Sequence, residues 1–245
     1  MKQFADLFAR LDATTKTNEK IAALAEFFTT APAEDSAWAI YFLSGRKLRQ
    51  LVPSKLLREW AAEEAGVPTW LFEESYSVVG DLAETISLIV PPGTVDGEQS
   101  LAHWVDRRLM PLRKLSPEDQ HNAVREIWRQ TSPEMRFVAM KLITGAFRVG
   151  VSKGLVTRGI AKSSGIEAET VAHRLMGNWE PSETFFQSVI QPGNDDARAS
   201  RPYPFCLAHP IEQATSPDRD GGPSQAAEIV SMVGPRSEFA AEWKW

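Results

Sequence analysis

The sequence predicts an all-α fold over most of its length, followed by a short, incomplete α+β segment. Apolar residues recur at helical spacing from the start of the chain to about residue 190, as in Phe4, Leu7 and Leu11. Strand-like alternation is scarce over that range. Ser116 and Ser132 are each followed by proline, and this pairing is typical of a helix start because serine caps the helix and proline suits its first turn.

The remaining helices follow from the same signals. A helix is expected after Pro53 with a stop at Gly66, and the helix that begins after Ser132 is expected to stop at Gly145. Gly80 and Asp81 open another helix, with apolar residues at helical spacing behind them. The last three helices are expected at Ser152–Ala161, Glu167–Met176 and Ser182–Ile190.

The composition changes after residue 190. Gln191–Pro202 is polar, has no periodic apolar residues and is typical of a linker. Beyond it come an extended segment, a polar stretch, a short helix and a strand-like end, at Tyr203–Ala208, Thr215–Gln225, Ala226–Val233 and Phe239–Trp245. We therefore expect a helical domain over 1–200 and the truncated beginning of a second domain over 201–245.

Composition excludes several classes of protein. The 245 residues are 43% hydrophobic and 24% charged, which is globular rather than disordered. The single cysteine, Cys206, excludes a disulfide framework and a cysteine-rich zinc site. No transmembrane span and no secretory signal is recognisable, so a cytoplasmic protein is expected. The four histidines share no metal-ligand spacing, and no catalytic motif occurs before residue 200.

Basic residues are segregated although the net charge is −5. Leu43–Arg58 and Met135–Gly165 contain basic residues and no Asp or Glu. A third cluster places Arg107, Arg108, Arg113 and Lys114 within eight positions. The first two windows contain Arg46, Lys47, Arg49, Lys55 and Arg58, then Arg136, Lys141, Arg148, Lys153, Arg158 and Lys162. Such windows can present a positive face to a polyanion, but they can equally be ordinary solvated helix faces.

The most informative stretch runs from Thr144 to Val156. Gly145 and Gly150 free the backbone for close approach to another surface, and Ser152 can cap the next helix. Arg148 and Lys153 flank that helix start, where unpaired N–H groups favour an anion. The combination suits a phosphate of a nucleic-acid backbone, and the alternative is an ordinary tight connection between two helices.

Val156 to Met176 has the rhythm of a helix-turn-helix motif. The first helix would end near Lys162, Gly165 would lie in the turn, and the second helix would present His173 and Arg174 outward. Helix pairs with a glycine turn are also common in all-α cores. Gly80 likewise allows close approach, although a structural cap together with Asp81 is the favoured interpretation.

Lys244 lies in an apolar, strand-like segment between two tryptophans. Alternation places Glu242 and Lys244 on one face of that strand. A lysine in a partly desolvated pocket can act as an amine nucleophile. From spacing alone, an exposed lysine on an edge strand is the favoured alternative.

These segments together resemble the N-terminal part of a bacterial ATP-dependent DNA ligase, over essentially the whole chain. The segments that carry the resemblance are Asp12–Lys20, Trp38–Arg46, Val79–Thr85, Leu142–Ser152, Tyr203–Pro210 and Glu242–Trp245. The last resembles the opening of that family's signature, lysine–any–Asp-Gly–any–Arg. The chain ends before the Asp-Gly and Arg, the later motifs and the OB-fold.

The resemblance implies that Lys244 attacks the α-phosphate of ATP and that Glu242 lies near the adenine. It further implies ATP and Mg²⁺ as cofactors of the complete parent enzyme, nicked double-stranded DNA as partner, a monomer, no membrane, and no activity of this fragment alone. Candidate DNA-binding residues are Arg46, Lys47, Gly80, Gly145, Arg148, Gly150, Ser152, Lys153, Lys162 and Arg174.

Two other classes stay open on the residues alone. A helix-turn-helix regulator would show strong preference for one DNA sequence. An α-helical protein-interaction scaffold would not bind DNA.

Overall fold

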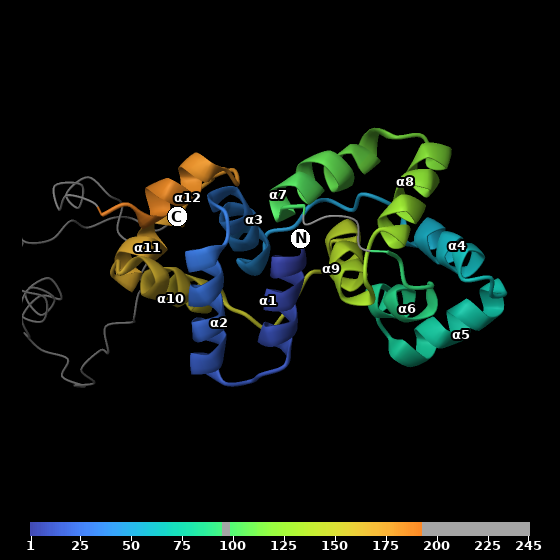
Figure 1. Ribbon diagram of the computed structural model, residues 1–245, viewed down its shortest axis with the longest axis horizontal. Coiled ribbons are helices and arrows are strands. Elements are labelled where there is room, and N and C mark those ends of the chain that lie inside the picture. Colours follow the sequence, from blue (N-terminus) through green and yellow to red (C-terminus); the bar gives the residue numbers. More distant parts are fainter. Residues whose placement is uncertain (95–98, 193–245) are drawn as a thin grey trace, which may run out of the picture. The chain divides into compact units, whose positions relative to one another are not determined.

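The computed structural model describes residues 1–94 and 99–192. In these residues the chain forms twelve α-helices and no strand, which confirms the predicted all-α class (Figure 1). The predictions for the segments beyond residue 192, including Glu242 and Lys244, lie outside the described residues.

The helices follow one another with short connections. Their bounds are α1 Lys2–Asp12, α2 Thr17–Thr30, α3 Ala33–Leu43, α4 Ser54–Glu64, α5 Thr69–Val79, α6 Leu82–Ile89, α7 Leu101–His103, α8 Pro117–Arg129, α9 Pro133–Thr144, α10 Lys153–Ser164, α11 Ala168–Arg174 and α12 Glu183–Ile190. A π-helical stretch, Trp104–Leu109, and a 3-10 stretch, Met110–Lys114, continue α7.

Serine caps start several of these helices, and those at Ser116, Ser132 and Ser152 were predicted. The hydroxyl oxygens of Ser116, Ser132, Ser152 and Ser182 each accept a hydrogen bond from the backbone N–H three residues later, at 3.1–3.4 Å. Each cap satisfies an N–H that the helix itself leaves unpaired. The sequence signal is reliable here because the cap depends on local chain geometry alone.

The helices pack in two groups that share one apolar core. In Figure 1, α1, α2 and α3 lie with α10, α11 and α12, whereas α4, α5, α6, α8 and α9 lie together in a second group. Contacts between α1 and α9 join the two groups, and α3 of the first group also contacts α7, which leads into α8 of the second. Because α9 and α10 belong to different groups, the segment between them crosses from one group to the other.

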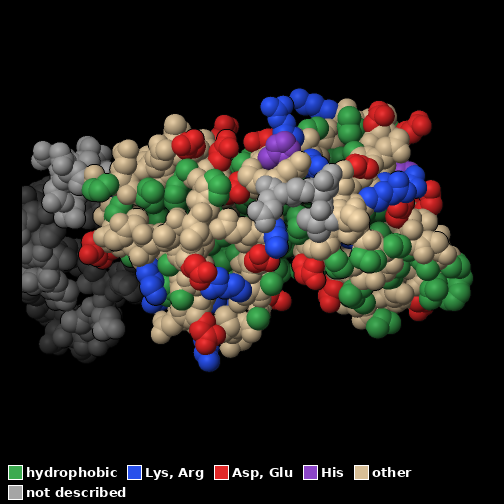
Figure 2. Space-filling model, viewed as in Figure 1, with side chains coloured by type: hydrophobic (Ala, Val, Ile, Leu, Met, Phe, Trp, Pro, Cys, Tyr) green, Lys and Arg blue, Asp and Glu red, His purple; other side chains and the backbone are tan. Residues whose placement is uncertain are grey.

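Tryptophans fill this core. Trp38, Trp60, Trp104 and Trp128 are all buried, the last completely. These four rings therefore pack in the core and are not available to stack on bases. Exposed large apolar side chains gather instead over α5 and α6 (Figure 2), where Trp70, Leu71, Val78 and Leu88 are the residues concerned.

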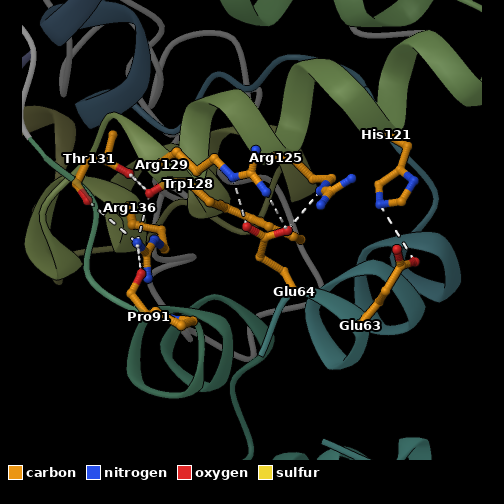
Figure 3. Close-up of polar contacts among 9 residues, drawn as sticks. All are labelled: Glu63, Glu64, Pro91, His121, Arg125, Trp128, Arg129, Thr131 and Arg136. Atoms are coloured by element: carbon orange, nitrogen blue, oxygen red, sulfur yellow. Dashed lines mark hydrogen bonds and ion pairs between the residues drawn. The ribbon is translucent and has the colours of Figure 1, made fainter. Parts of the chain in front are cut away.

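Arg136 does not contribute to a positive face, which is one of the two interpretations that its basic window allows. It is fully buried on α9, and its guanidinium donates to the carbonyl oxygens of Val90 at 2.6 Å and of Pro91 and Trp128 at 2.7 Å (Figure 3). The charge is therefore used to pair carbonyls at the ends of α6 and α8. A buried charge persists only where such partners exist.

Glu64 joins α4 to α8 through two ion pairs. Its carboxylate lies 2.7 Å from Nε of Arg125 and 2.9 Å from Nε of Arg129 (Figure 3). Burial raises the pKa of Glu64, but hydrogen bonds from both arginines outweigh it and hold the pKa below its usual range. No helix within the described ranges is long and apolar enough to span a bilayer.

Replacing Arg136 by Met is expected to lower the free energy of unfolding by about 2–4 kcal/mol. The substitution leaves buried carbonyls without donors, and hydrogen bonds to a charged group are worth about 1.5–3 kcal/mol each before desolvation is offset. Urea unfolding followed by circular dichroism measures this. The exposed Arg113, which has no polar partner in the described part of the chain, is the matched control, and Arg113→Met is expected to stay within about 0.5 kcal/mol of wild type. Equal stability of the two variants would contradict the structural role of Arg136.

Candidate nucleic-acid interface

The end of α9 turns the chain sharply into the segment that links the two helical groups. Gly145 has a φ of 69°, and the N–H of Ala146 donates to the carbonyl of Lys141 at 3.1 Å. This hydrogen-bond pattern is a Schellman cap, which favours glycine because the residue is left-handed. The predicted stop at Gly145 is confirmed.

Residues 146–150 alternate between core and solvent. Phe147 and Val149 are 8% and 6% exposed, whereas Arg148 between them is exposed. The Phe147 ring stacks on Phe4 with centroids 5.6 Å apart, and it meets the ring of Phe8 edge-on at 5.3 Å. Two buried neighbours therefore direct Arg148 outward. This anchor was not predicted, although the alternation Phe-Arg-Val is visible in the sequence.

The start of α10 follows directly. Ser152 caps it, and Lys153 and Gly154 are exposed at its first turn. Within the described ranges, neither Arg148 nor Lys153 has a carboxylate partner. Two uncompensated cations thus flank a helix N-terminus, where free N–H groups and the helix dipole also favour an anion.

The segment after α3 runs beside this loop. The backbone N–H of Leu51 donates to the carbonyl of Ile143 at 3.1 Å. A Cβ atom at Gly145 would lie 3.3 Å from the Leu48 carbonyl oxygen and 3.8 Å from Cδ of Lys47. The structure therefore brings Lys47 to the Gly145 turn.

Arg46 is positioned differently from the exposed cations. It is half-buried, donates to the carbonyl oxygens of Gly177 at 2.8 Å and Trp179 at 3.0 Å, and lies 4.1 Å from the Trp179 ring centroid. Arg46 and Lys153 line the same pocket, of about 480 Å³. Arg46 thus ties α3 to the segment between α11 and α12, and its partners are neutral.

Gly80 and Asp81 act as caps, as favoured from the sequence. Gly80 is left-handed at the end of α5, and Asp81 accepts from the N–H of Glu84 at 3.1 Å. Asp81 also pairs with Lys141 in the last turns of α9. Lys141 is buried, so it does not form part of an outward basic face. The ion pair fixes the Gly80 turn relative to the helix that ends at Gly145.

Lys162 and Arg174 do not join this cluster. Lys162 lies at the other end of α10, roughly 14 Å along the axis from Lys153 at 1.5 Å per residue. Arg174 was expected to point outward, and that expectation is wrong. Its guanidinium turns to α12 and donates to the carbonyls of Val189 at 2.7 Å and Gln191 at 2.6 Å.

The structure therefore does not support a sequence-reading helix-turn-helix motif at α10 and α11. The helix pair exists, with left-handed Gly165 in the turn, but α11 has only seven residues and its end caps α12. A recognition helix needs a free face at its N-terminal end that can enter the major groove. Among the described residues, no cluster of His, Cys, Asp or Glu could hold a metal ion.

Comparison with known proteins agrees with the resemblance noted above. Residues 1–161 match the protein family described as DNA ligase N terminus. The chain belongs to this family.

Curated relatives of this ligase N terminus come from bacteria and archaea. A probable DNA ligase of Koribacter versatilis is 28% identical over 230 residues, which cover 87% of this chain and 38% of that protein. A probable DNA ligase of Dictyoglomus thermophilum is 27% identical over 62% of this chain and 27% of its own length. A DNA ligase of Thermococcus fumicolans is 26% identical over 71% and 34%. The chain thus spans about a third of the length of these relatives.

The Asp81–Lys141 pair predicts a specific pH dependence. Burial raises the pKa of Asp81, but the Lys141 ammonium and the Glu84 N–H outweigh it and hold the pKa below its usual range. A carboxyl with a lowered pKa in the folded state stabilises the fold above its unfolded pKa of about 3.9, and the contribution is lost as the pH falls through the folded pKa. We expect Asp81→Asn to cost about 1–3 kcal/mol at pH 7, since it leaves Lys141 unpaired, and to remove that acid-dependent loss.

Asn is as good a helix cap as Asp, so Asp81→Asn isolates the ion pair. Asp81→Ala loses the cap as well and is expected to cost about 1 kcal/mol more. Urea unfolding between pH 7 and pH 3 measures both variants. An Asp81→Asn protein with the same acid-induced loss as wild type would show that Asp81 is not the group concerned.

Proposed function

We propose that this chain is the DNA-binding, N-terminal part of an ATP-dependent DNA ligase. It binds nicked duplex DNA through the sugar–phosphate backbone on either side of the nick, across the minor groove, with little sequence preference. The helical domain over residues 1–200 does this as a monomer in the cytoplasm, and residues 201–245 begin the adenylation domain.

The observation that carries the proposal is the set of uncompensated cations around one anchored loop. Arg148 and Lys153 are exposed at the start of α10, and Lys47 lies against Gly145. Within the described part of the chain none of the three pairs with a carboxylate. Cations held beside backbone N–H groups are suited to phosphate oxygens, which position a duplex without reading its sequence.

The other charged residues also support binding at this loop. The chain carries 32 acidic and 27 basic side chains, so its net charge does not itself attract DNA, and binding depends on where unpaired cations lie. Several other basic residues are occupied internally, as Arg136 and Lys141 are. Arg148 and Lys153 differ from these, because both are exposed at the loop and available to a phosphate.

For the complete enzyme we propose Lys244 as the nucleophile. Its amine attacks the α-phosphate of ATP and pyrophosphate leaves. The AMP, held by a phosphoramide bond, is then passed to the 5′-phosphate of the nick, and the 3′-hydroxyl attacks that 5′-phosphate and releases AMP. Glu242 is proposed to lie near the adenine. Magnesium supplies charge compensation for the phosphates. The support is the resemblance of Glu242–Trp245 to the family signature and the ligase names of the relatives.

Duplex binding is expected to weaken steeply with salt. Each neutralised phosphate contributes about −0.9 to the slope of log K against log salt concentration, so replacing Arg148 and Lys153 together by Ala is expected to flatten the slope by about 1 to 2 units. Fluorescence anisotropy with a labelled nicked duplex at several salt concentrations measures this. Lys55 lies on α4, where its nearest acidic partner is Glu59 at 3.9 Å, and Lys55→Ala is the control with an expected slope change near zero.

An unchanged slope in the double variant would show that the glycine-bearing loop is only a structural turn. A preference of several kcal/mol for one operator sequence over random DNA would instead favour a sequence-reading regulator. Wild-type protein that binds no duplex at all would favour a protein-interaction scaffold.

The role of Lys244 is tested in a ligase that continues this sequence through the later motifs. Incubation with labelled ATP and magnesium, followed by denaturing electrophoresis, is expected to show covalent AMP on the wild type and none on Lys244→Ala. AMP uptake by Lys244→Ala would remove this lysine from the mechanism. The 245-residue chain itself is expected to stay unlabelled, because aligning the amine with the phosphate requires fixed groups around the triphosphate that the resemblance places in the later motifs.

A further inference from the structure

Lys20 is a buried cation that pairs with no carboxylate among the described residues. It lies on α2, is only 8% exposed, and donates from Nζ to the carbonyl oxygen of Gly150 at 2.9 Å. This is its one polar contact among the described residues. An ammonium has three donors, and removing it from water without an opposite charge costs free energy.

Lys141 shows how the same protein treats another buried lysine. Lys141 is 9% exposed, close to the value for Lys20, but it is paired with the carboxylate of Asp81. A bound carboxylate is therefore the arrangement by which this fold compensates a buried ammonium. For Lys20, the described part of the chain offers only a neutral carbonyl.

The ammonium of Lys20 lies against Gly150, which is part of the proposed phosphate-binding loop. Gly150 has a φ of 61°, and a Cβ atom there would lie 3.3 Å from Nζ of Lys20. Glycine at this position therefore leaves room for the ammonium as well as permitting the turn. Gly150 itself is exposed, two residues after the outward Arg148 and two before the Ser152 cap.

We propose that Lys20 is a phosphate-binding residue whose counter-ion is a backbone phosphate of the bound duplex. One N–H of the ammonium holds the Gly150 carbonyl, and the others are available to a phosphate oxygen at the loop. This inference rests on the proposed function, because it requires duplex DNA at the Gly145–Lys153 loop. It adds a binding residue on α2, 130 positions from the loop it serves.

The alternative is that Lys20 only holds the loop in place through its hydrogen bond to Gly150. The variant Lys20→Met distinguishes this structural role from phosphate binding. An uncompensated buried charge can be replaced by an apolar side chain of similar size with little or no loss of stability. If the proposal holds, Lys20→Met unfolds at the wild-type urea concentration or above it, while its affinity for a nicked duplex falls roughly tenfold and the salt slope flattens by about 0.9.

Three further variants complete the test. Lys20→Gln keeps a donor for Gly150 but not the charge, so it should lose affinity as Lys20→Met does, whereas Lys20→Arg should retain the salt slope. Lys141→Met leaves Asp81 unpaired and should lower the urea midpoint. Lys55→Met removes an exposed charge on α4 and should change neither the urea midpoint nor the salt slope.

A Lys20→Met protein with a lowered urea midpoint and an unchanged salt slope would overturn the proposal in favour of a structural pin, and so would failure of Lys20→Met to fold. So would a Lys20→Gln protein that binds as wild type does. These outcomes are distinct from failure of the proposed function, in which the wild type itself shows no salt-dependent duplex binding. Anisotropy titrations at four salt concentrations and urea unfolding of the same preparations supply all the readouts.

Discussion

The burial of Phe147 in the phenylalanine cluster of the first helical group is the contact on which the proposed interface depends. Its ring centroid lies within 6 Å of the ring centroids of Phe4 and Phe8 on α1 and of Phe42 on α3. Aromatic pairs at such distances contribute beyond their buried area. Because Phe147 and Val149 are held in the core, the residues between and beside them face solvent in one fixed arrangement. The loop therefore loses its conformational entropy when the protein folds and not when it binds DNA.

Two sets of cations in the protein have different physical roles. Arg136, Lys141 and Arg46 have partners inside the protein, and they bind helix ends and connections together. Arg148 and Lys153 are exposed without carboxylate partners in the described part. The cations with internal partners fix the geometry of the turns. The exposed Arg148 and Lys153 supply the positive potential that attracts a polyanion. Counting basic residues along the chain does not separate them.

Local signals made most of the fold predictable. Serine caps and glycine stops depend on a few neighbouring residues, so the starts of α8, α9, α10 and α12 and the end of α9 follow from the sequence. The loop with Arg148 and Lys153 was predictable for the same reason. Long-range contacts were not. The Asp81–Lys141 pair, the inward turn of Arg174 and the contact of Lys20 with Gly150 join residues far apart in the chain, and nothing in the local pattern specifies them.

The most direct test of the account maps the bound surface residue by residue. Backbone amide shifts of the isotope-labelled chain are followed by NMR during titration with a nicked duplex of mixed sequence. If the loop between α9 and α10 binds the DNA backbone, the largest shifts fall on residues 145–154, with Lys47 and Lys20 included, and α5 and α6 respond little. Shifts concentrated on the exposed apolar residues of α5 and α6, with residues 145–154 unchanged, would contradict binding at this loop.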